Sequence, residues 1–395
     1  MSKNNENKLV PKLRFSEFKD DWNPEQLSNL LDYERPDNYI VKDTNYVTEG
    51  TPVLTANKSF ILGYTHETFG ICNDIPAIIF DDFTVDKKFV DFPFKVKSSA
   101  IKILRPKGKD DLKFLFELMS LIRFEAKEHK RYYISAYQNL SVLIPKPKEQ
   151  QIIAACLSSI DEVIIAESQK LEVLKDHKKG LLQNLLPQEG ETVPKFRFKE
   201  FEESGEWVEK KLGEVADFIN GRAYKQQELL SEGKYRVLRV GNFFTNNEWY
   251  YSDLELDEDK YCANGDLLYA WSASFGPRIW IGEKVIYHYH IWKVKNKNGV
   301  NKKFLFNLLD FETERMKSQM ANGFALLHIT KGTIENWKSH IPVSEKEQQI
   351  IADTLSSIDD LINAQNQKLE ALQLHKKGLL QGLFPSVNDG DNGKI

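Results

Sequence analysis

The sequence contains two copies of one 40-residue segment, and this repeat limits the fold more than any other feature. Residues 148–187 and 346–385 are identical at 28 of 40 positions, at a constant offset of 198 residues. The segment that opens each copy also recurs, because PKLRFSEF at 11–18 returns as PKFRFKEF at 194–201. A tryptophan, Trp22 or Trp207, follows closely in each case. The chain therefore consists of two copies of one structural module.

The regions between these shared ends diverge, and the second region is longer than the first. Only short similarities remain, such as Phe-Leu-Phe at 114–116 and 304–306, and Ile-Pro at 144–145 and 341–342. Two modules that keep their ends and differ in their middles are predicted to share a scaffold and to differ in what they recognise.

The repeated segment has the spacing of a coiled coil, since its seam positions alternate at intervals of three and four residues. Each helix is predicted to run for about 36 residues, or about 54 Å. Pro187 and Pro385 are expected to end the helices, because proline cannot continue one. The first seam is Leu157, Ile160, Ile164, Glu167, Leu171, Leu174, Lys178, Leu181 and Leu185, and the second is Leu355, Ile358, Ile362, Gln365, Leu369, Leu372, Lys376, Leu379 and Leu383.

The polar seam positions favour pairing of the two helices with each other in an antiparallel register. Setting Glu167 opposite Lys376 also sets Lys178 opposite Gln365, so both interruptions gain a polar partner and fix the register at some cost in stability. The same register pairs Leu171 with Leu372 and Leu174 with Leu369.

The apolar stripe is wider than the seam alone, which predicts further burial. The additional surface covers either the globular part of each copy or another subunit, and the sequence leaves both open. The flanking residues are Ile152, Val163, Leu182 and Leu186 in the first helix and Ile350, Leu361, Leu380 and Phe384 in the second.

The chain of 395 residues, 41% hydrophobic and 28% charged, is expected to form a soluble protein of two or three domains. Its polar start and the lack of a run of about 18 apolar residues predict a cytoplasmic location without membrane spans. Cys72, Cys156 and Cys262 lack metal-site spacing and are expected to pack as small apolar residues.

The predicted fold is α+β, with two mixed α/β recognition domains joined by two long antiparallel coiled-coil helices in a pseudo-twofold arrangement. Apolar runs at 77–80 and 267–270, each preceded by turn-forming residues, are expected to be strands. The boundaries are a polar tail at 1–11, a first domain at 12–145, a helix at 146–187, a second domain at 194–341, a helix at 342–385 and a polar tail at 386–395.

Basic residues gather late in each copy, although the net charge is -4. Residues 86–131 hold 13 Lys or Arg against 7 Asp or Glu, and residues 260–340 hold 12 against 6. A local positive field attracts DNA, Arg and Asn pair with base edges, and Lys and Ser mostly hold phosphates. The candidate DNA-binding residues are Asn57, Lys58, Lys87, Lys88, Arg131, Tyr132, Tyr133 and Gln138 in the first copy, and Arg222, Tyr224, Lys225, Arg236, Arg239, Asn242, Ser272, Ser274, Arg278 and Lys331 in the second.

Catalytic motifs are missing from the sequence. It has no phosphate-binding Gly-rich loop, no dinucleotide fingerprint and no Ser-His-Asp or metal-ligand pattern. Asn23-Pro24-Glu25-Gln26 lacks the second proline and the aromatic residue typical of adenine amino methyltransferases. His288 and His290 alternate on one strand face, and packing or phosphate contact is favoured over metal binding because no acidic or Cys ligand is near in sequence. We therefore expect a non-catalytic reader without a cofactor of its own.

The sequence resembles the DNA-specificity subunits of type I restriction-modification systems over nearly its full length. The resemblance is carried by Ile-Pro followed closely by Gln-Gln-Ile-Ile-Ala after 144 and 341, by Leu-Ser-Ser-Ile-Asp at 157 and 355, and by His-Lys-Lys-Gly-Leu-Leu-Gln at 177 and 375. The order of variable region and repeated helix, duplicated, is itself specific.

The resemblance implies two recognition domains that each read half of a split double-stranded DNA target, with helices that set the half-site spacing and bind two methyltransferase subunits. It also implies restriction subunits in the full complex, with S-adenosylmethionine, ATP and Mg belonging to the partners. The competing hypotheses are a stand-alone DNA-binding regulator that self-associates through its helices, and a coiled-coil scaffold whose domains bind proteins.

Overall fold

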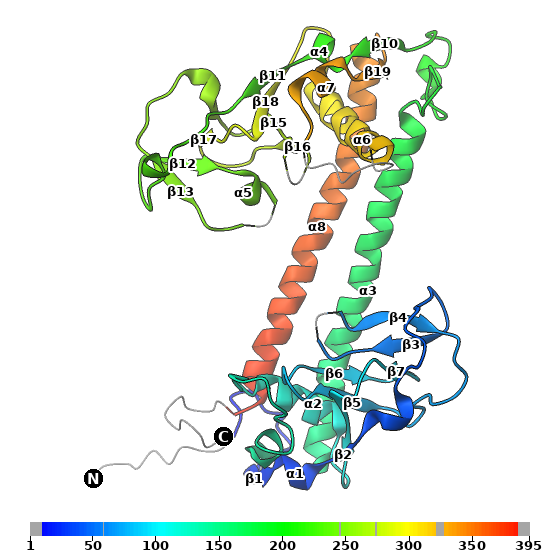
Figure 1. The fold of residues 1–395 in the computed structure, drawn as a ribbon, viewed down its shortest axis with the longest axis vertical. Coiled ribbons are helices and arrows are strands. Elements are labelled where there is room, and N and C mark those ends of the chain that lie inside the picture. The colour runs from blue at the N-terminus through cyan, green and yellow to red at the C-terminus, as the bar shows by residue number, and fades with distance from the viewer. Residues whose placement is uncertain (1–9, 58, 245, 273–274, 321–327, 386–395) are drawn as a thin grey trace. The chain divides into compact units, whose positions relative to one another are not determined.

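A computed structural model describes residues 10–57, 59–244, 246–272, 275–320 and 328–385 (Figure 1). The chain divides into two compact units. The first comprises Met1–Ser168 with Gln367–Ile395, and the second comprises Gln169–Asn366. Each unit thus combines one divergent region with part of both repeated helices. The predicted tails lie outside the described residues, apart from positions 10 and 11.

The repeated segments form two helices of 39 residues each, α3 Pro147–Leu185 and α8 Glu345–Leu383. Figure 1 shows each as a continuous helix. Both end two residues before their prolines, Pro187 and Pro385, because the residue before a proline disfavours helical backbone angles. Seam side chains such as Leu157 and Leu355 are fully buried, while the positions between them are mostly exposed. The heptad spacing therefore predicted the buried stripe of both helices.

The helices pair antiparallel within each unit. In the first unit, Leu157 near the start of α3 shares a core with Leu383 at the end of α8. In the second unit, Leu355 near the start of α8 shares a core with Leu185 at the end of α3. The start of one helix therefore meets the end of the other, as the α+β fold prediction requires.

The predicted register is wrong by about one heptad. Lys376 was expected opposite Glu167, but its ammonium contacts Asp161 at 2.6 Å, and Lys178 likewise contacts Asp359 at 2.7 Å. Glu167 instead accepts a hydrogen bond from Lys368 at 2.5 Å. A shift of seven residues leaves the apolar seam unchanged, so the seam alone cannot select the register. The two Lys-Asp pairs occupy equivalent positions of the repeat and satisfy both cations.

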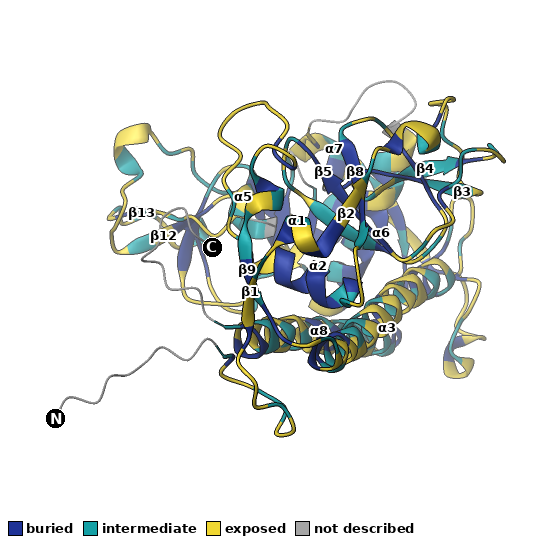
Figure 2. Cartoon of the chain, turned by 90° about the horizontal axis from the view of Figure 1, so that it is seen from below, coloured by how far each residue is buried: buried dark blue, intermediate teal, exposed yellow. Residues whose placement is uncertain are grey.

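A four-stranded sheet in the order β2-β8-β5-β6 forms the centre of the first unit, beside a sheet β4-β3-β7 and a pair β1-β9. The elements are β1 Asn23–Gln26, α1 Leu27–Leu30, β2 Leu31–Glu34, η1 Pro36–Tyr39, β3 Thr51–Leu54, β4 Ile61–Thr65, β5 Ala77–Asp81, β6 Lys87–Val90, β7 Lys95–Val96, β8 Ile101–Pro106, α2 Leu112–Leu121, η2 Tyr137–Asn139 and β9 Ser141–Ile144. The apolar run of β5 is buried at every position (Figure 2), and Phe114 of α2 belongs to the same hydrophobic core as Ile78 and Phe80 of this strand. Asp111 caps α2 by accepting a hydrogen bond from the Phe114 amide.

The second unit has the same arrangement with one additional strand, β14, in its smaller sheet: the sheets are β11-β18-β15-β16 and β13-β12-β17-β14, beside a pair β10-β19. The elements are η3 Lys199–Phe201, β10 Val208–Lys211, α4 Leu212–Val215, β11 Ala216–Asn220, η4 Gln226–Glu228, β12 Tyr235–Leu238, α5 Val240–Phe244, β13 Tyr250–Ser252, η5 Glu258–Lys260, β14 Tyr261–Cys262, β15 Leu267–Ala270, β16 Gly276–Ile279, β17 Val285–Tyr287, β18 Ile291–Asn296, α6 Lys302–Met320, α7 Lys331–Asn336 and β19 Lys338–Ile341. Trp292 on β18 packs between Phe218 and Tyr269 in its core. The strand predictions at 77–80 and 267–270 correspond to β5 and β15.

A buried carboxylate at the start of each long helix holds the opening segment of its unit. Glu149 accepts hydrogen bonds from Arg14 at 2.8 Å and from Trp22 at 3.3 Å. In the second unit, the equivalent Glu347 accepts hydrogen bonds from Arg197 at 2.7 Å and Trp207 at 3.1 Å. The Arg and Trp that recur in the opening segments therefore donate hydrogen bonds to the Glu that recurs in the helices.

The opening segments also contact the far ends of the helices by backbone hydrogen bonds. The Leu13 amide donates to the Gly382 carbonyl, and the Phe196 amide donates to that of Asn184, each at 2.8 Å. Gly382 and Asn184 occupy the same position of the repeat. A side chain at Gly382 would meet Leu13, since an added Cβ would lie 2.5 Å from its Cδ1 atom. In each unit, the opening segment thus contacts the start of one long helix and the end of the other through equivalent residues of the repeat.

Candidate nucleic-acid interface

The first-unit candidates lie on separate segments. Lys87 and Lys88 are half-buried on β6, and burial lowers the pKa of Lys87 to about 8. The Lys87 ammonium stands 5.7 Å from the centre of the Tyr137 ring. Lys87 therefore lies beside an aromatic ring and carries less charge at neutral pH than an exposed lysine does.

The remaining polar candidates of this unit stand on loops and turns. Asn57, after β3, accepts a hydrogen bond from Thr55, and Gln138 on η2 donates one to the Ile134 carbonyl. Arg131 is exposed. Lys58 lies outside the described residues.

Tyr132 and Tyr133 are no longer candidates for DNA binding, because both side chains lie in the core and are only 4% and 1% exposed. Tyr132 uses its hydroxyl locally, accepting from the Glu128 amide and donating to the Glu128 carbonyl. Tyr133 packs against Phe80, and burial raises its pKa. The two side chains complete the packing of the unit and present no ring to a ligand.

Several cations of the second unit already have carboxylate partners. Arg222 forms two hydrogen bonds with Glu228, at 2.8 and 3.1 Å, and this pairing raises the pKa of Arg222. Arg236 lies 3.2 Å from Glu283. Lys331 on α7 lies 3.5 Å from Glu335 one turn later. These pairs reduce the charge that the three candidates offer to DNA.

The other second-unit candidates lie around the same sheets. Tyr224 is half-buried, and its hydroxyl donates to the Tyr287 carbonyl at 3.5 Å. Lys225 is exposed at the start of η4, Arg278 is exposed on β16, and Ser272 forms an isolated bridge with His328. Ser274 lies outside the described residues.

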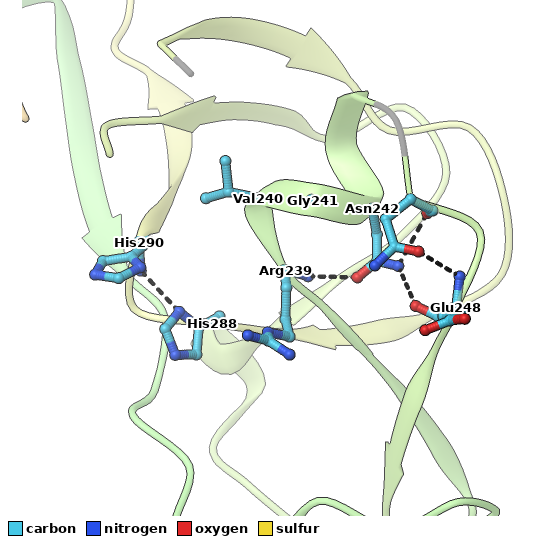
Figure 3. Close-up of a pocket in the computed structure, with 8 residues that line it drawn as sticks. Arg239, Val240, Gly241, Asn242, Glu248, His288 and His290 are labelled. Carbon is cyan, nitrogen blue, oxygen red and sulfur yellow. Dashed lines mark hydrogen bonds between the residues drawn. The ribbon is translucent and has the colours of Figure 1, made fainter. Parts of the chain in front are cut away.

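Arg239 lies in a pocket of about 220 Å³ beside α5 (Figure 3). The guanidinium carbon stands 5.0 Å from the centre of the Tyr250 ring, a cation-π contact. In Figure 3 the guanidinium turns toward His288, while Glu248 lies on the other side. The lining residues are Arg239, Val240, Gly241, Asn242, Asn246, Glu248, His288 and His290.

Asn242 is corrected from a base-reading candidate to a residue that fixes the pocket wall. Its amide group donates to the Asn246 carbonyl at 3.1 Å and to the Glu248 carbonyl at 2.6 Å. Its oxygen accepts from the Arg239 amide at 3.3 Å. Pairing with adenine needs a free amide donor, and both amide hydrogens are already used.

His288 and His290 form the opposite wall of the pocket and remain neutral at neutral pH. Burial, together with His290 and Arg239, lowers the pKa of His288 to about 4. Burial and Arg239 also lower the pKa of His290. The His290 amide donates to Nδ1 of His288 at 3.4 Å, so the His288 proton resides on Nε2. The sequence favoured packing or phosphate contact for this pair, and the structure places both rings in the pocket wall.

Sequence reasoning missed Glu248 and Asn246 as members of this pocket, and Tyr250 as the ring that contacts Arg239. DNA contacts are mostly made by cations, amides and hydroxyls, so an acidic side chain such as Glu248 does not fit that pattern. The spacing of Arg239 and Asn242 around a short helix was the available signal.

The described residues contain no group of three or more His, Cys, Asp or Glu side chains that could hold a metal ion. Cys72 and Cys262 are buried free thiols, and Cys156 is half-buried. Within the same described ranges, no helix is both long enough and apolar enough to cross a membrane.

Comparison with protein families matches residues 204–374 to the type I restriction modification DNA specificity domain. The matched stretch contains the Arg239 pocket and most of α8. It therefore covers most of the second variable region and most of the second repeated helix.

Two curated relatives are similar to this chain in sequence, one over about a third of its length and one over most of it. The Escherichia coli type I restriction enzyme EcoR124I/EcoR124II specificity subunit is 41% identical over 151 residues, which span 36% of this chain and 37% of that protein. The Methanocaldococcus jannaschii type I restriction enzyme MjaVIII specificity subunit is 27% identical over 387 residues, spanning 90% of this chain and 87% of that protein.

Two solved structures share the fold. The first is the type I restriction-modification S subunit from M. genitalium. It has a TM-score of 0.60 at 16% identity, and the similarity covers 96% of this chain and 100% of the M. genitalium chain. The second is a chain from a structural study of complex assembly and conformational transition in the type I restriction-modification system. It has a TM-score of 0.54 at 15% identity, and the similarity covers 92% of this chain and 98% of that chain.

Proposed function

Because the chain belongs to the family of DNA specificity subunits of type I restriction-modification systems, we propose that each unit reads one half of a bipartite DNA target. The observation that carries this proposal is one strand topology presenting two different polar surfaces. The second unit offers the Arg239 pocket, whereas the first offers β6 with Lys87 and Lys88. Two unlike reading surfaces on one scaffold favour a target with two unlike halves.

The helices set the distance between the half-sites in this proposal. Both α3 and α8 continue through the boundary between the two units. A continuous helix has a fixed rise of about 1.5 Å per residue, so its length can serve as a ruler. The charged pairs Lys178-Asp359 and Lys376-Asp161 hold the two helices in register.

The chemistry belongs to partner subunits. Two methyltransferase subunits supply adenine methylation with S-adenosylmethionine, and restriction subunits supply translocation and cleavage with ATP and Mg. The chain itself contributes recognition and assembly, without a catalytic centre of its own.

Sequencing of methylated adenines in the host, with and without this gene, tests the proposal. The expected result is a two-part motif with a constant spacer that vanishes when the gene is deleted. The purified chain should also form a defined complex with the methyltransferase encoded in the same system. A chain that binds DNA fully and specifically alone, and ignores that methyltransferase, would contradict the proposal.

We place the methyltransferase docking surfaces on the exposed apolar positions of the helices. Val163 and Leu361 occupy the same position of the repeat, one in each unit, and are 43% and 52% exposed. Val173 and Leu374 are still more exposed, at 66% and 70%. By contrast, the flanking residues Leu182 and Phe384 are buried in the cores of their own units. The wide stripe therefore covers the globular regions at some positions and stays open at others.

Replacing Val163 and Leu361 by Asp should weaken methyltransferase binding by at least tenfold without unfolding the chain. A charge desolvated in an apolar interface is unfavourable, whereas the same charge on the free surface meets water. Binding is measured by titration of the purified chain with the methyltransferase, and Glu172→Ala on an exposed face of α3 is the control. Unchanged binding in the double variant would remove these positions from the docking surface.

A further inference from the structure

Among the residues that the structure describes, the Arg239 pocket combines a cation without an ion pair, two neutral imidazoles and one carboxylate. We propose that this pocket reads the major-groove edge of one G·C base pair, a proposal that rests on the proposed function. Arg239 donates to guanine O6 and N7, and Glu248 accepts from the cytosine N4 amino group. This makes Glu248 a specificity-determining residue.

Arg239 has the geometry of a base-reading arginine. The Tyr250 ring lies 5.0 Å from the guanidinium carbon, and this cation-π contact uses none of the N–H donors. Within the described ranges it forms no ion pair, unlike Arg222 and Arg236, which are held by Glu228 and Glu283. A free donor fork matches the two adjacent acceptors of guanine.

Glu248 favours a base pair over a phosphate as the ligand. Its backbone is fixed on both sides, since its amide donates to Asn246 Oδ1 at 2.8 Å and its carbonyl accepts from Asn242. Its side chain is exposed at the pocket and has no partner among the residues that the structure describes. A carboxylate repels a phosphate, but it accepts a hydrogen bond from the amino group of cytosine.

The histidines support the same choice of ligand. His288 points into the pocket beside the Arg239 guanidinium (Figure 3). Its Nδ1 atom accepts from the His290 amide, so the ring offers a single neutral donor at Nε2. A phosphate site gains most from added positive charge, and the two neutral imidazoles add none to this pocket. The pocket therefore provides donors for guanine and an acceptor for cytosine.

The first test compares methylation motifs made by complete methyltransferase complexes that carry variant chains. Arg239→Ala and Glu248→Ala should relax the motif at the same G·C pair, with a loss of about 5- to 150-fold in preference for that pair. Lys284→Ala is the control, because Lys284 is an exposed cation of the same unit that is paired with Glu258, and it should leave the motif unchanged.

The second test needs no substitution in the protein. Replacing guanine at that position by 7-deazaguanine removes the N7 acceptor and should weaken DNA binding by the wild-type complex about 5- to 10-fold. The same replacement should have no effect on the Arg239→Ala complex, because the donor is already gone. This coupling identifies the contact even if the variant binds weakly.

Three outcomes overturn the assignment of the pocket: an equal loss with Arg239→Ala on all sequences, relaxation at an A·T pair, or relaxation by the two variants at different positions. A bipartite wild-type motif that Arg239→Ala leaves unchanged also overturns it, while the proposed function stands. A wild-type complex without any bipartite motif overturns the proposed function itself.

Discussion

Deleting residues 164–170 together with 362–368 should move methylation to targets whose spacer is about three base pairs shorter. The two deletions remove one equivalent heptad from each long helix, or about 10.5 Å at 1.5 Å per residue. One base pair adds about 3.4 Å along the duplex, so the loss corresponds to about three pairs. The shift follows because, in the proposed function, helix length sets the spacing of the half-sites.

The design of this deletion follows from the observed helix contacts. Removing a whole heptad keeps the phase of the seam, so residues on either side of the cut stay on the buried face. Both charged pairs, Lys178-Asp359 and Lys376-Asp161, survive. The length-matched control exchanges the two heptads between the helices, which alters their sequence but not their length.

Sequencing of methylated adenines reads out the spacer directly. The exchanged-heptad control should keep the wild-type spacer, and the deletion should lose it. A deleted chain that still directs methylation at the original spacing would contradict the ruler, since helix length would then be irrelevant.

The repeat allowed much of the fold to be predicted from the sequence, because heptad spacing determines which face of each helix is buried. The antiparallel pairing was also predicted, although the polar contacts that argued for it belong to a register about one heptad away from the observed one. The register was not predicted correctly, because seam periodicity is the same after a shift of seven residues. The register is set in part by charges beside the seam, as with Asp161 and Asp359, and by the attachment of each unit to the helix ends.

The candidate site was harder to predict than the fold. Residue type alone cannot distinguish Arg239 from Arg222, because the difference is a partner, Glu228, brought close by a local turn. Nor does it distinguish an exposed tyrosine from Tyr133, which a three-dimensional core buries. Electrostatic pairing and burial are tertiary properties, so the sequence could only propose candidates in both copies. The structure places Arg239 and Asn242 in one pocket, most of which comes from residues before the basic region 260–340.

The two buried Arg-Glu pairs could have been predicted from the repeat. Arg14 and Glu149 are 135 residues apart, and Arg197 and Glu347 are 150 apart. Each pair unites two segments that had been identified separately as repeats. Segments that recur together are candidates for mutual contact, and this inference needs only the sequence.

Replacing Glu347 by Ala should destabilise the chain by about 3 kcal/mol, because it leaves a nearly buried cation without its partner. Glu347 is 1% exposed and the Arg197 side chain 10%, so solvent screens the pair little. Arg197 loses both side-chain hydrogen bonds to Glu347, and Trp207 loses its acceptor. For a unit of this size the melting temperature should fall by about 6–12 °C.

Thermal unfolding of the full chain measures this effect, and matched variants define its cause. Glu149→Ala should act with similar size, because Arg14 and Trp22 surround it in the same way. Glu347→Gln keeps an acceptor for Trp207 but loses the charge, so its effect should lie between wild type and Glu347→Ala. Glu200→Ala removes the exposed pair with Lys346 and should cost less than about 1 kcal/mol. Equal melting temperatures for Glu347→Ala and Glu200→Ala would show that the buried carboxylate does not hold the opening segment.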